Sequence, residues 1–279
     1  MTDTDALPQA LKDAVAAASF DGTVTIAYSG GLDSRFLAFA ASKLGYRVVL
    51  LHVAGPHMAP SESEGAVRDA RDMGLTVTVI TANPLGITEL AAAGKNRCYV
   101  CKRHVFTELL KHAAGSRLCD GTNASDLTVY RPGRKALTEL GIHSPLAEAG
   151  IGKPDIRRIA RTMGMARPDQ AARPCLLTRF PYGMMPDAGT LSLIAEAEDW
   201  LEAQLEAQPE ARGLKFRLRF PNPQKRDEAV LHVEKSSLGS RTEADLNHLV
   251  QRLKTQFSPK LNFLTYAVLE KLSGFYDRT

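Results

Sequence analysis

The sequence predicts an α/β protein in which a parallel sheet, flanked by helices, is followed by a smaller α+β module. Three observations lead to this prediction. Through the first 120 residues, apolar stretches rich in β-branched residues alternate with stretches of helical periodicity. Such alternation is typical of parallel strands joined by right-handed crossovers, with helices on both faces of the sheet. A proline-rich stretch at 167–186 ends the alternation, and strands and helices are mixed beyond it.

The elements of the first half follow from the hydrophobic pattern. Apolar runs predict strands at 24–28, 47–53, 76–80 and 117–120. Amphipathic stretches predict helices at 5–19, 61–73 and 99–114. Ser61 and Glu64 have the spacing of a capping box at the start of the second of these helices. Because the carboxyl ends of parallel strands share one edge of a sheet, we expect the loops 29–34, 52–56 and 120–126 to meet there.

The elements of the second half are interrupted by proline and glycine. A helix is expected near 154–163, with a proline at an early position. Beyond the proline-rich stretch we expect, in order, a helix at 190–208, strands at 214–220 and 229–234, a helix at 241–256 and a strand at 261–269. We therefore expect two domains, 1–170 and 171–279, of which the second carries Cys175.

Composition limits the class of protein. The 279-residue chain has a formal net charge of +4, which suits an anionic small molecule or a nucleic acid equally. It contains no run of about eighteen apolar residues, so we expect no membrane-spanning helix. Residues 1–5 include acids where a signal peptide would carry bases, and we expect a cytoplasmic location. Four cysteines in that compartment favour thiols, metal ligands or redox groups over structural disulfides.

A glycine turn between the first strand and the next helix is the main functional candidate. It reads Ser29-Gly30-Gly31, and Asp33 and Ser34 follow in the helix. Backbone N–H groups at a helix N-terminus attract an anion, and glycine lets a phosphate approach the backbone. The alternative is a tight turn capped by a serine, with no ligand. The pattern SGGxDS resembles the signature of the PP-loop ATP pyrophosphatases, which split ATP between its α and β phosphates.

Further segments extend the resemblance. They are Asn96-Arg-Cys-Tyr-Val-Cys-Lys102, Gly121-Thr-Asn-Ala-Ser-Asp126, Tyr130-Arg-Pro-Gly133, Ser144-Pro-Leu-Ala-Glu148 and Arg179-Phe-Pro-Tyr-Gly183. With Lys153 and Pro174-Cys175, they look like the LarE family of ATP-dependent sulfur transferases. The resemblance covers about residues 20–185 and departs at Ser125, where the family usually has an acid.

The resemblance implies a reaction and a set of residues. Members of the family adenylate a carboxylate of pyridinium-3,5-biscarboxylic acid mononucleotide and convert it to a thiocarboxylate, for the nickel-pincer nucleotide cofactor. ATP and Mg²⁺ are therefore expected, and Cys175, Asp33 and Lys153 are the catalytic candidates. The ATP and pyrophosphate contacts are expected at Ser29, Gly30, Gly31, Asp33, Ser34, Gly121 and Asn123. A substrate phosphate is expected at Arg179, Arg217 and Arg219, and Asp33 and Asp126 are candidate Mg²⁺ ligands.

The cysteines bear on the source of the sulfur. In one form of the family the cysteine matching Cys175 gives up its own sulfur, and that form lacks a Cys-x-x-Cys pair. This chain has Cys98 and Cys101, and it resembles the form in which three cysteines hold a [4Fe-4S] cluster that takes sulfide from outside. A zinc site with a fourth ligand such as His104, a redox disulfide and buried apolar thiols remain alternatives. Cys119 ends an apolar strand and is expected in the core.

Other functions fit parts of the same pattern. A tRNA thiolase would also use a PP-loop and cysteine-bound iron, but it would carry a basic accessory domain or a broad basic face, and neither is evident. A nucleotide-binding iron–sulfur sensor would bind ATP without releasing pyrophosphate. The leading hypothesis has a small carboxylate nucleotide as substrate, an external sulfide donor, no nucleic acid or membrane partner and, as the family implies, a homo-oligomer.

Overall fold

The computed structural model describes residues 4–129, 131–208, 213–222, 228–261 and 263–277. Tyr130, part of one motif segment, lies outside these residues. The chain divides into two compact units, residues 1–90 with 96–174 and residues 91–95 with 175–279. The assignment of separate functions to 1–170 and 171–279 stays a prediction. Within the described ranges, no helix is both long and apolar enough to cross a membrane.

The first unit is built on a parallel sheet of four strands in the order β3-β2-β1-β4. Its strands are β1 (Thr23–Ala27), β2 (Arg47–Ala54), β3 (Val77–Thr81) and β4 (Leu118–Cys119). Its helices are α1 (Gln9–Ala18), α2 (Leu32–Lys43), α3 (Pro60–Asp72), α5 (Arg97–His112), α6 (Gly133–Glu139), α7 (Pro145–Glu148) and α8 (Lys153–Thr162). Between β3 and α5 lie η1 (Pro84–Gly86), α4 (Thr88–Ala92) and η2 (Gly94–Asn96), and η3 (Ala124–Thr128) follows β4.

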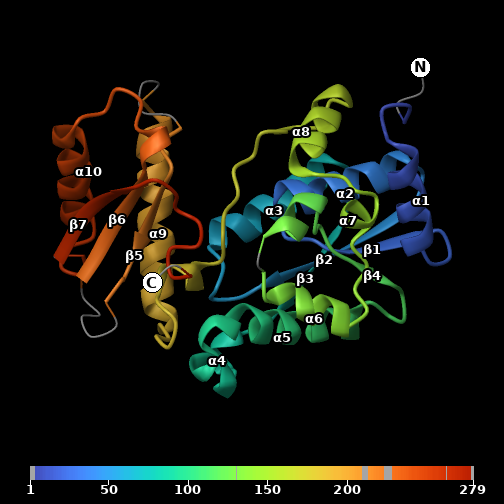
Figure 1. The fold of residues 1–279 in the computed structure, drawn as a ribbon, viewed down its shortest axis with the longest axis horizontal. Helices are drawn as coiled ribbons and strands as arrows, with labels where there is room; N and C mark the ends of the chain where they lie inside the picture. Colours follow the sequence, from blue (N-terminus) through green and yellow to red (C-terminus); the bar gives the residue numbers. More distant parts are fainter. Residues whose placement is uncertain (1–3, 130, 209–212, 223–227, 262, 278–279) are drawn as a thin grey trace. The chain divides into compact units, whose positions relative to one another are not determined.

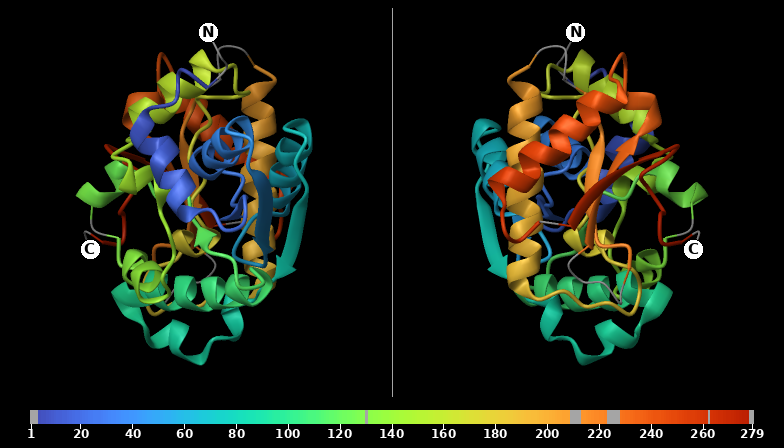
Figure 2. Two further views of the ribbon diagram at one scale, coloured as in Figure 1. Left: turned by 90° about the vertical axis from the view of Figure 1, so that its right-hand side faces the viewer. Right: turned by 90° about the vertical axis from the view of Figure 1, so that its left-hand side faces the viewer.

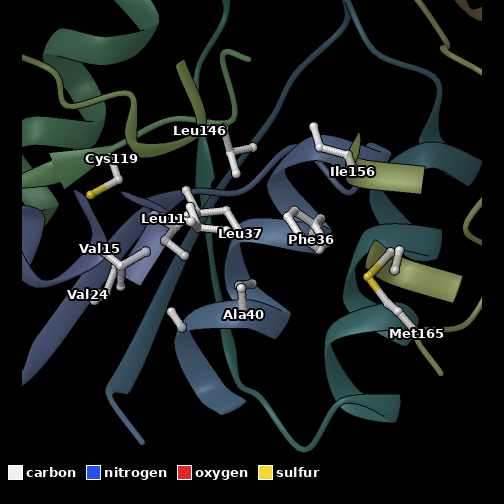
Figure 3. Packing of buried hydrophobic residues seen from close by; sticks show 14 of the residues in the cluster. Leu11, Val15, Val24, Phe36, Leu37, Ala40, Cys119, Leu146, Ile156 and Met165 are labelled. Carbon is white, nitrogen blue, oxygen red and sulfur yellow. The ribbon is translucent and has the colours of Figure 1, made fainter. Parts of the chain in front are cut away.

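Each face of this sheet carries its own core. On one face α1, α2, α3 and α8 pack on the sheet, and on the other α5 and α6 do so (Figure 1). Adjacent residues of β2 show the alternation, since Leu50 belongs to the first core and Leu51 to the second. In Figure 3, Leu11 and Val15 of α1 lie with Val24 of β1 and Leu37 of α2. The predicted α/β class, with helices on both faces, is confirmed.

The second unit contains a smaller sheet in the order β5-β6-β7. Its elements are η4 (Leu176–Arg179), α9 (Ala188–Glu206), β5 (Phe216–Arg219), β6 (Glu228–Glu234), η6 (Lys235–Ser237), α10 (Glu243–Gln256) and β7 (Phe263–Leu269). β5 and β6 are antiparallel, whereas β6 and β7 are parallel and are joined through α10. Figure 2 shows α9 and α10 beside these three strands. The predicted smaller C-terminal α+β module is confirmed.

One predicted helix start is wrong. α3 begins at Pro60 after Ala59, and no side chain caps it. Proline is favoured at the first position because its missing N–H would have no helical partner there. Ser61 therefore lies inside the helix, and its buried hydroxyl has no hydrogen-bond partner among the described residues. The capping box expected from Ser61 and Glu64 does not form.

Candidate functional site

The glycine turn between β1 and α2 is shaped by two contacts that exclude a side chain. Gly30 has a φ of +75°, and a Cβ added to it would stand 2.5 Å from the Cβ of Ala66 on α3. Residues with a Cβ rarely adopt such a φ, and two carbons cannot approach so closely. Glycine is required here on both grounds, and the turn lies directly on α3.

Two serine hydroxyls close the turn. The N–H of Ser29 donates to Ser34 Oγ at 3.2 Å, and the two hydroxyl oxygens are 3.1 Å apart. Ser34 Oγ also lies 3.2 Å from the carbonyl oxygen of Gly31, to which it can donate. The N–H of Gly31 donates to Ser29 Oγ at 3.3 Å. The predicted loop residues therefore form one hydrogen-bonded turn, with the serines at its two ends.

The turn leaves the N-terminus of α2 without a side-chain cap. Gly31 is the residue before the helix, and this cap position offers no side-chain hydrogen bond to the first turn. The first N–H groups of a helix have no partner within the helix, and the helix dipole places partial positive charge there. This end of α2 is therefore suited to an anion such as pyrophosphate.

The loop after β4 approaches the same helix end. A Cβ added to Gly121 would stand 2.7 Å from the backbone nitrogen of Ser34 and 3.1 Å from the carbonyl carbon of Asp33. The predicted meeting of the loops after β1 and β4 is confirmed by this contact. Glycine at 121 lets the second loop lie against the start of α2.

Asp33 and Lys153, 120 positions apart in the chain, form an ion pair at this end of α2. Lys153 Nζ donates to both carboxylate oxygens of Asp33, at 2.6 and 2.7 Å. The side chains are 24% and 27% exposed, so both remain accessible to a ligand. Lys153 opens α8, and its backbone N–H donates to Ser125 Oγ at 3.0 Å. Ser125 therefore caps this helix, at the position where the family pattern usually has an acid.

Asn123 and Asp126 hold the loop after β4 in shape. Asn123 Oδ1 accepts from the N–H of Ser125, and Asp126 Oδ2 accepts from the N–H of Asn123, which is a capping box around η3. Asp126 Oδ1 also pairs with Arg131 at 2.8 Å. Both side chains thus have structural partners, and their predicted contacts with ATP and Mg²⁺ stay predictions.

The cysteines occupy four different settings. Cys98 is exposed and Cys101 half-buried, and both lie in the first two turns of α5, three positions apart. That spacing places them on one face of the helix. Cys119 is 0% exposed in β4, which confirms the prediction of a core residue, and burial raises the pKa of its thiol to about 12. Cys175 is half-buried and opens the second unit.

None of the four thiols forms a disulfide, and the described residues contain no group of three or more His, Cys, Asp or Glu side chains arranged to hold a metal. Binding of a cluster by Cys98, Cys101 and Cys175 stays a prediction.

Arg179 stabilises the turn that begins at Cys175 through hydrogen bonds. Its guanidinium makes a two-point contact with Glu198 of α9, at 3.0 and 2.6 Å, and Nη1 donates to the carbonyl of Cys175 at 3.3 Å. The Arg179 side chain is only 5% exposed. Arg179 therefore holds the backbone of Cys175 against α9, and its predicted contact with a substrate phosphate stays a prediction.

Arg217 and Arg219 alternate along β5 and reach the same acceptor. Nη groups of both donate to the carbonyl oxygen of Leu272. Arg219 Nη1 also donates to Nδ1 of His232 at 2.9 Å, and its Nε is buried without a hydrogen-bond partner in the part of the chain that the structure describes. Burial, and then repulsion from a neighbouring arginine, lowers the pKa of each guanidinium to about 10. Burial and then Arg219 lower the pKa of His232 to about 4, so the ring is neutral and Nδ1 can accept. The predicted phosphate site here stays a prediction, with unused donor capacity on Arg219.

Two residues near the turn were missed by the sequence analysis. Arg35, 2% exposed on α2, donates to Gln170 Oε1 at 2.6 Å, and Gln170 Nε2 donates to the carbonyl of Gly30 at 3.1 Å. Neither spacing nor residue type distinguishes them, because arginine and glutamine are ordinarily surface residues. The two residues are 135 positions apart in the sequence, and only the folded structure brings them into contact.

Comparison with known proteins identifies three relatives that match this chain over 180 to 185 residues. No family model matches the chain. An uncharacterized protein of Synechocystis is 38% identical over 180 residues, which cover 63% of this chain and 67% of the relative. An uncharacterized protein of Methanocaldococcus jannaschii is 33% identical over 181 residues, covering 64% and 69%. The pyridinium-3,5-bisthiocarboxylic acid mononucleotide synthase of Lactiplantibacillus plantarum is 30% identical over 185 residues, covering 64% and 67%.

Proposed function

Because the chain belongs to the LarE family, represented by the Lactiplantibacillus plantarum synthase, we propose that it is an ATP-dependent sulfurtransferase. It adenylates a carboxylate of pyridinium-3,5-biscarboxylic acid mononucleotide and replaces a carboxylate oxygen with sulfur. The product belongs to the biosynthesis of the nickel-pincer nucleotide cofactor. The observation that carries the proposal is the Asp33–Lys153 pair at the uncapped N-terminus of α2.

Activation comes first because a carboxylate is an anion without a leaving group. A carboxylate oxygen of the substrate attacks the α phosphorus of ATP, the bond to the bridging oxygen breaks, and pyrophosphate leaves. The glycine turn and the first N–H groups of α2 bind the pyrophosphate as its charge develops. Ser29, Gly30, Gly31, Ser34, Gly121 and Asn123 line this position in the proposal.

Lys153 and Asp33 have complementary roles. Lys153 Nζ supplies a positive charge for the phosphate oxygens, and Asp33 holds that ammonium group in place through two hydrogen bonds. The accessible carboxylate of Asp33 is of the chemical type that Mg²⁺ prefers, and we propose Asp33, with Asp126, as its ligands. The metal supplies charge neutralisation on the transferring phosphoryl group.

Sulfur transfer completes the reaction. A hydrosulfide attacks the acyl carbon of the adenylate, AMP leaves, and a proton is released to solvent. Two thiols on one face at the N-terminal end of α5 fit a thiolate-ligated iron site, since the helix dipole favours thiolates there. We propose that Cys98, Cys101 and Cys175 hold a [4Fe-4S] cluster, which supplies an open iron position for external sulfide.

The C-terminal unit completes the proposal. Arg179, Arg217 and Arg219 outnumber the carboxylates of Glu198, which pairs with Arg179, and of Glu234, which acts on Arg217, so added negative charge is favourable there. We propose that this unit binds the phosphate of the substrate nucleotide. We also propose that the protein is cytoplasmic and forms a homo-oligomer.

The test uses anaerobically purified protein. Iron and zinc are measured, and the protein is then incubated with ATP, Mg²⁺, sulfide and the biscarboxylic acid mononucleotide. We expect about four irons per chain, pyrophosphate release that depends on the acid, and a thiolated acceptor by mass spectrometry. A colourless protein that contains zinc would contradict the cluster. Loss of a sulfur atom from Cys175 would show that Cys175 itself is the donor.

A lysine variant tests the nucleotide site directly. Lys153→Met removes the ammonium group from Asp33, and we expect pyrophosphate release to fall about 100-fold, as for other preorganised donors to a developing charge. The matched control is Lys111→Met, which breaks an exposed lysine–carboxylate pair with Glu108 on α5. Equal rates for the two variants would exclude Lys153 from the reaction.

A further inference from the structure

Gln170 bridges two groups whose chemistry determines how its amide is oriented. Its Oε1 accepts from Arg35 Nη1 at 2.6 Å, and its Nε2 donates to the carbonyl oxygen of Gly30 at 3.1 Å. A guanidinium can only donate and a carbonyl can only accept, so one amide orientation satisfies both. Gln170 is thus a directional link from a buried cation to the glycine turn.

The orientation of the Gly30 carbonyl also sets the orientation of the Gly31 N–H, a proposed hydrogen-bond donor to the phosphate. The peptide between Gly30 and Gly31 is planar, and in the trans form its C=O and N–H point in opposite directions. A carbonyl held by Gln170 therefore aims the N–H of Gly31 away from Gln170. Two adjacent glycines make this peptide easy to rotate. Gln170 restrains it at the carbonyl of Gly30, and Ser29 Oγ, the acceptor for the N–H of Gly31, restrains it at the other end.

Arg35 ties the same link to the segment that leads to Cys175. Its guanidinium donates to Gln170 Oε1 and to the carbonyl oxygen of Ala166, each at 2.6 Å, and lies 3.4 Å from Asp69. Since Arg35 is 2% exposed, water cannot replace these acceptors without opening the fold. Residues 166–170 are therefore held in place by a buried charge.

Asp69 strengthens this arrangement from α3. Its carboxylate pairs with Arg35 and with Arg167, and the Asp69 side chain is 13% exposed. α2, α3 and residues 166–170 thus surround the glycine turn and share one charge network. Gln170 is the member of that network that touches the turn itself.

We propose that Gln170 is a positioning residue that couples the state of the glycine turn to the segment 166–174, which ends next to Cys175. It pre-forms the turn for pyrophosphate, and pyrophosphate in turn steadies the segment. The inference rests on the proposed ATP chemistry, because that chemistry places pyrophosphate at the turn.

Two variants separate the contacts of Gln170. Gln170→Glu keeps an acceptor for Arg35 but turns an oxygen toward the Gly30 carbonyl, where two acceptors repel. Gln170→Met removes both contacts and is expected to lower the thermal midpoint as well. The matched control is Asp169→Asn, which changes an exposed neighbour that pairs with Arg161 instead.

Binding of inorganic pyrophosphate and of α,β-methylene-ATP, each with Mg²⁺, is measured by calorimetry on the full chain. Hydrogen exchange of residues 166–174 is followed with and without the analogue. In the wild type and in Asp169→Asn, the analogue should slow exchange in this segment at least threefold. In Gln170→Glu, both ligands should bind about fivefold to tenfold more weakly, with an unchanged thermal midpoint, and the segment should no longer respond.

The outcomes distinguish this inference from the proposed function. A wild-type protein that binds neither ligand would overturn the proposed function and this inference with it. A wild-type protein that binds both ligands, with Gln170→Glu indistinguishable in affinity and exchange, would overturn the inference alone. Slowed exchange of 166–174 that persists in Gln170→Glu would also overturn it.

Discussion

At the scale of single residues, Gly30 meets two requirements at once. Its φ of +75° is unfavourable for residues with a side chain, and Ala66 occupies the space that a Cβ would need. The backbone cost and the steric cost can be separated, because other glycines, such as Gly22, have a positive φ but free space for a Cβ.

Gly30→Ala should therefore destabilise the fold by about 2–4 kcal/mol, the sum of the backbone and the steric cost. It should also abolish pyrophosphate binding, because α3 or the turn must move. Chemical unfolding and calorimetry measure the two effects.

Gly22→Ala is the matched control. Gly22 has a φ of +66° with nothing within 4 Å of an added Cβ, so only the backbone cost of about 1 kcal/mol applies. Equal losses for the two variants would show that the contact with Ala66 has no energetic weight.

The residues of the turn could be predicted because they are contiguous and their types match their chemistry. Lys153 could be nominated only through the family resemblance, and its pairing with Asp33 came from the fold. Gln170 could not be predicted at all. Its role depends on a contact made across 140 positions of sequence with a backbone carbonyl, which has no residue-type signature.

At the scale of elements, the positions of strands and helices were predictable from periodicity, and their ends were less so. α3 starts at Pro60 instead of being capped by Ser61, because a proline at the first position competes with a polar cap. The capping box of Asn123 and Asp126 was missed, since the helix it begins is a short 3₁₀ turn without an apolar periodic face.

The contact between the loop after β4 and the start of α2 gives a prediction at this scale. Gly121→Ala places a Cβ 2.7 Å from the nitrogen of Ser34, so the loop must withdraw from the end of α2. We expect pyrophosphate affinity to fall at least tenfold and the free energy of unfolding to fall by about 1–3 kcal/mol.

Gly86→Ala provides the comparison, because an added Cβ there has no atom within 4 Å. Binding calorimetry on both variants is the measurement. If Gly121→Ala bound pyrophosphate as tightly as Gly86→Ala, the two loops would not form one site.

At the scale of the whole molecule, buried histidines link stability to pH. Burial lowers the pKa of His57 and of His232 to about 4, and it lowers the pKa of His52 from its ordinary 6.5. Below pH 6.5 the unfolded chain takes up protons at these positions. In the folded chain His57 and His232 do so only near pH 4, and burial also lowers the pKa of His52. Stability is therefore present above pH 6.5 and is lost as the pH falls through this window.

We expect the free energy of unfolding to fall between pH 6.5 and pH 4 by on the order of 3 kcal/mol for each of His57 and His232. His232→Gln keeps an acceptor for Arg219 without a titrating ring, so its stability should fall less steeply. Urea unfolding at a series of pH values measures this. A slope for His232→Gln equal to that of the wild type would contradict the assignment.

The α/β class was predictable because β1 and the second half of β2 are buried, and burial leaves continuous apolar runs in the sequence. The sheet order β3-β2-β1-β4 and the parallel pairing of β6 with β7 were not predicted. Strand neighbours are chosen by packing between distant segments, and no local pattern encodes that choice.

The buried guanidinium of Arg35 has a practical consequence for anyone who wishes to shorten this protein. Both apolar cores of the first unit are complete by Met165, so a cut just after that residue looks harmless. It would delete the acceptors at Ala166 and Gln170, so that the Arg35 guanidinium keeps its ion pair with Asp69 but loses two hydrogen bonds. Removing the acceptors of a buried charged donor costs about 1–3 kcal/mol or more, so a stable truncated version has to extend beyond Gln170.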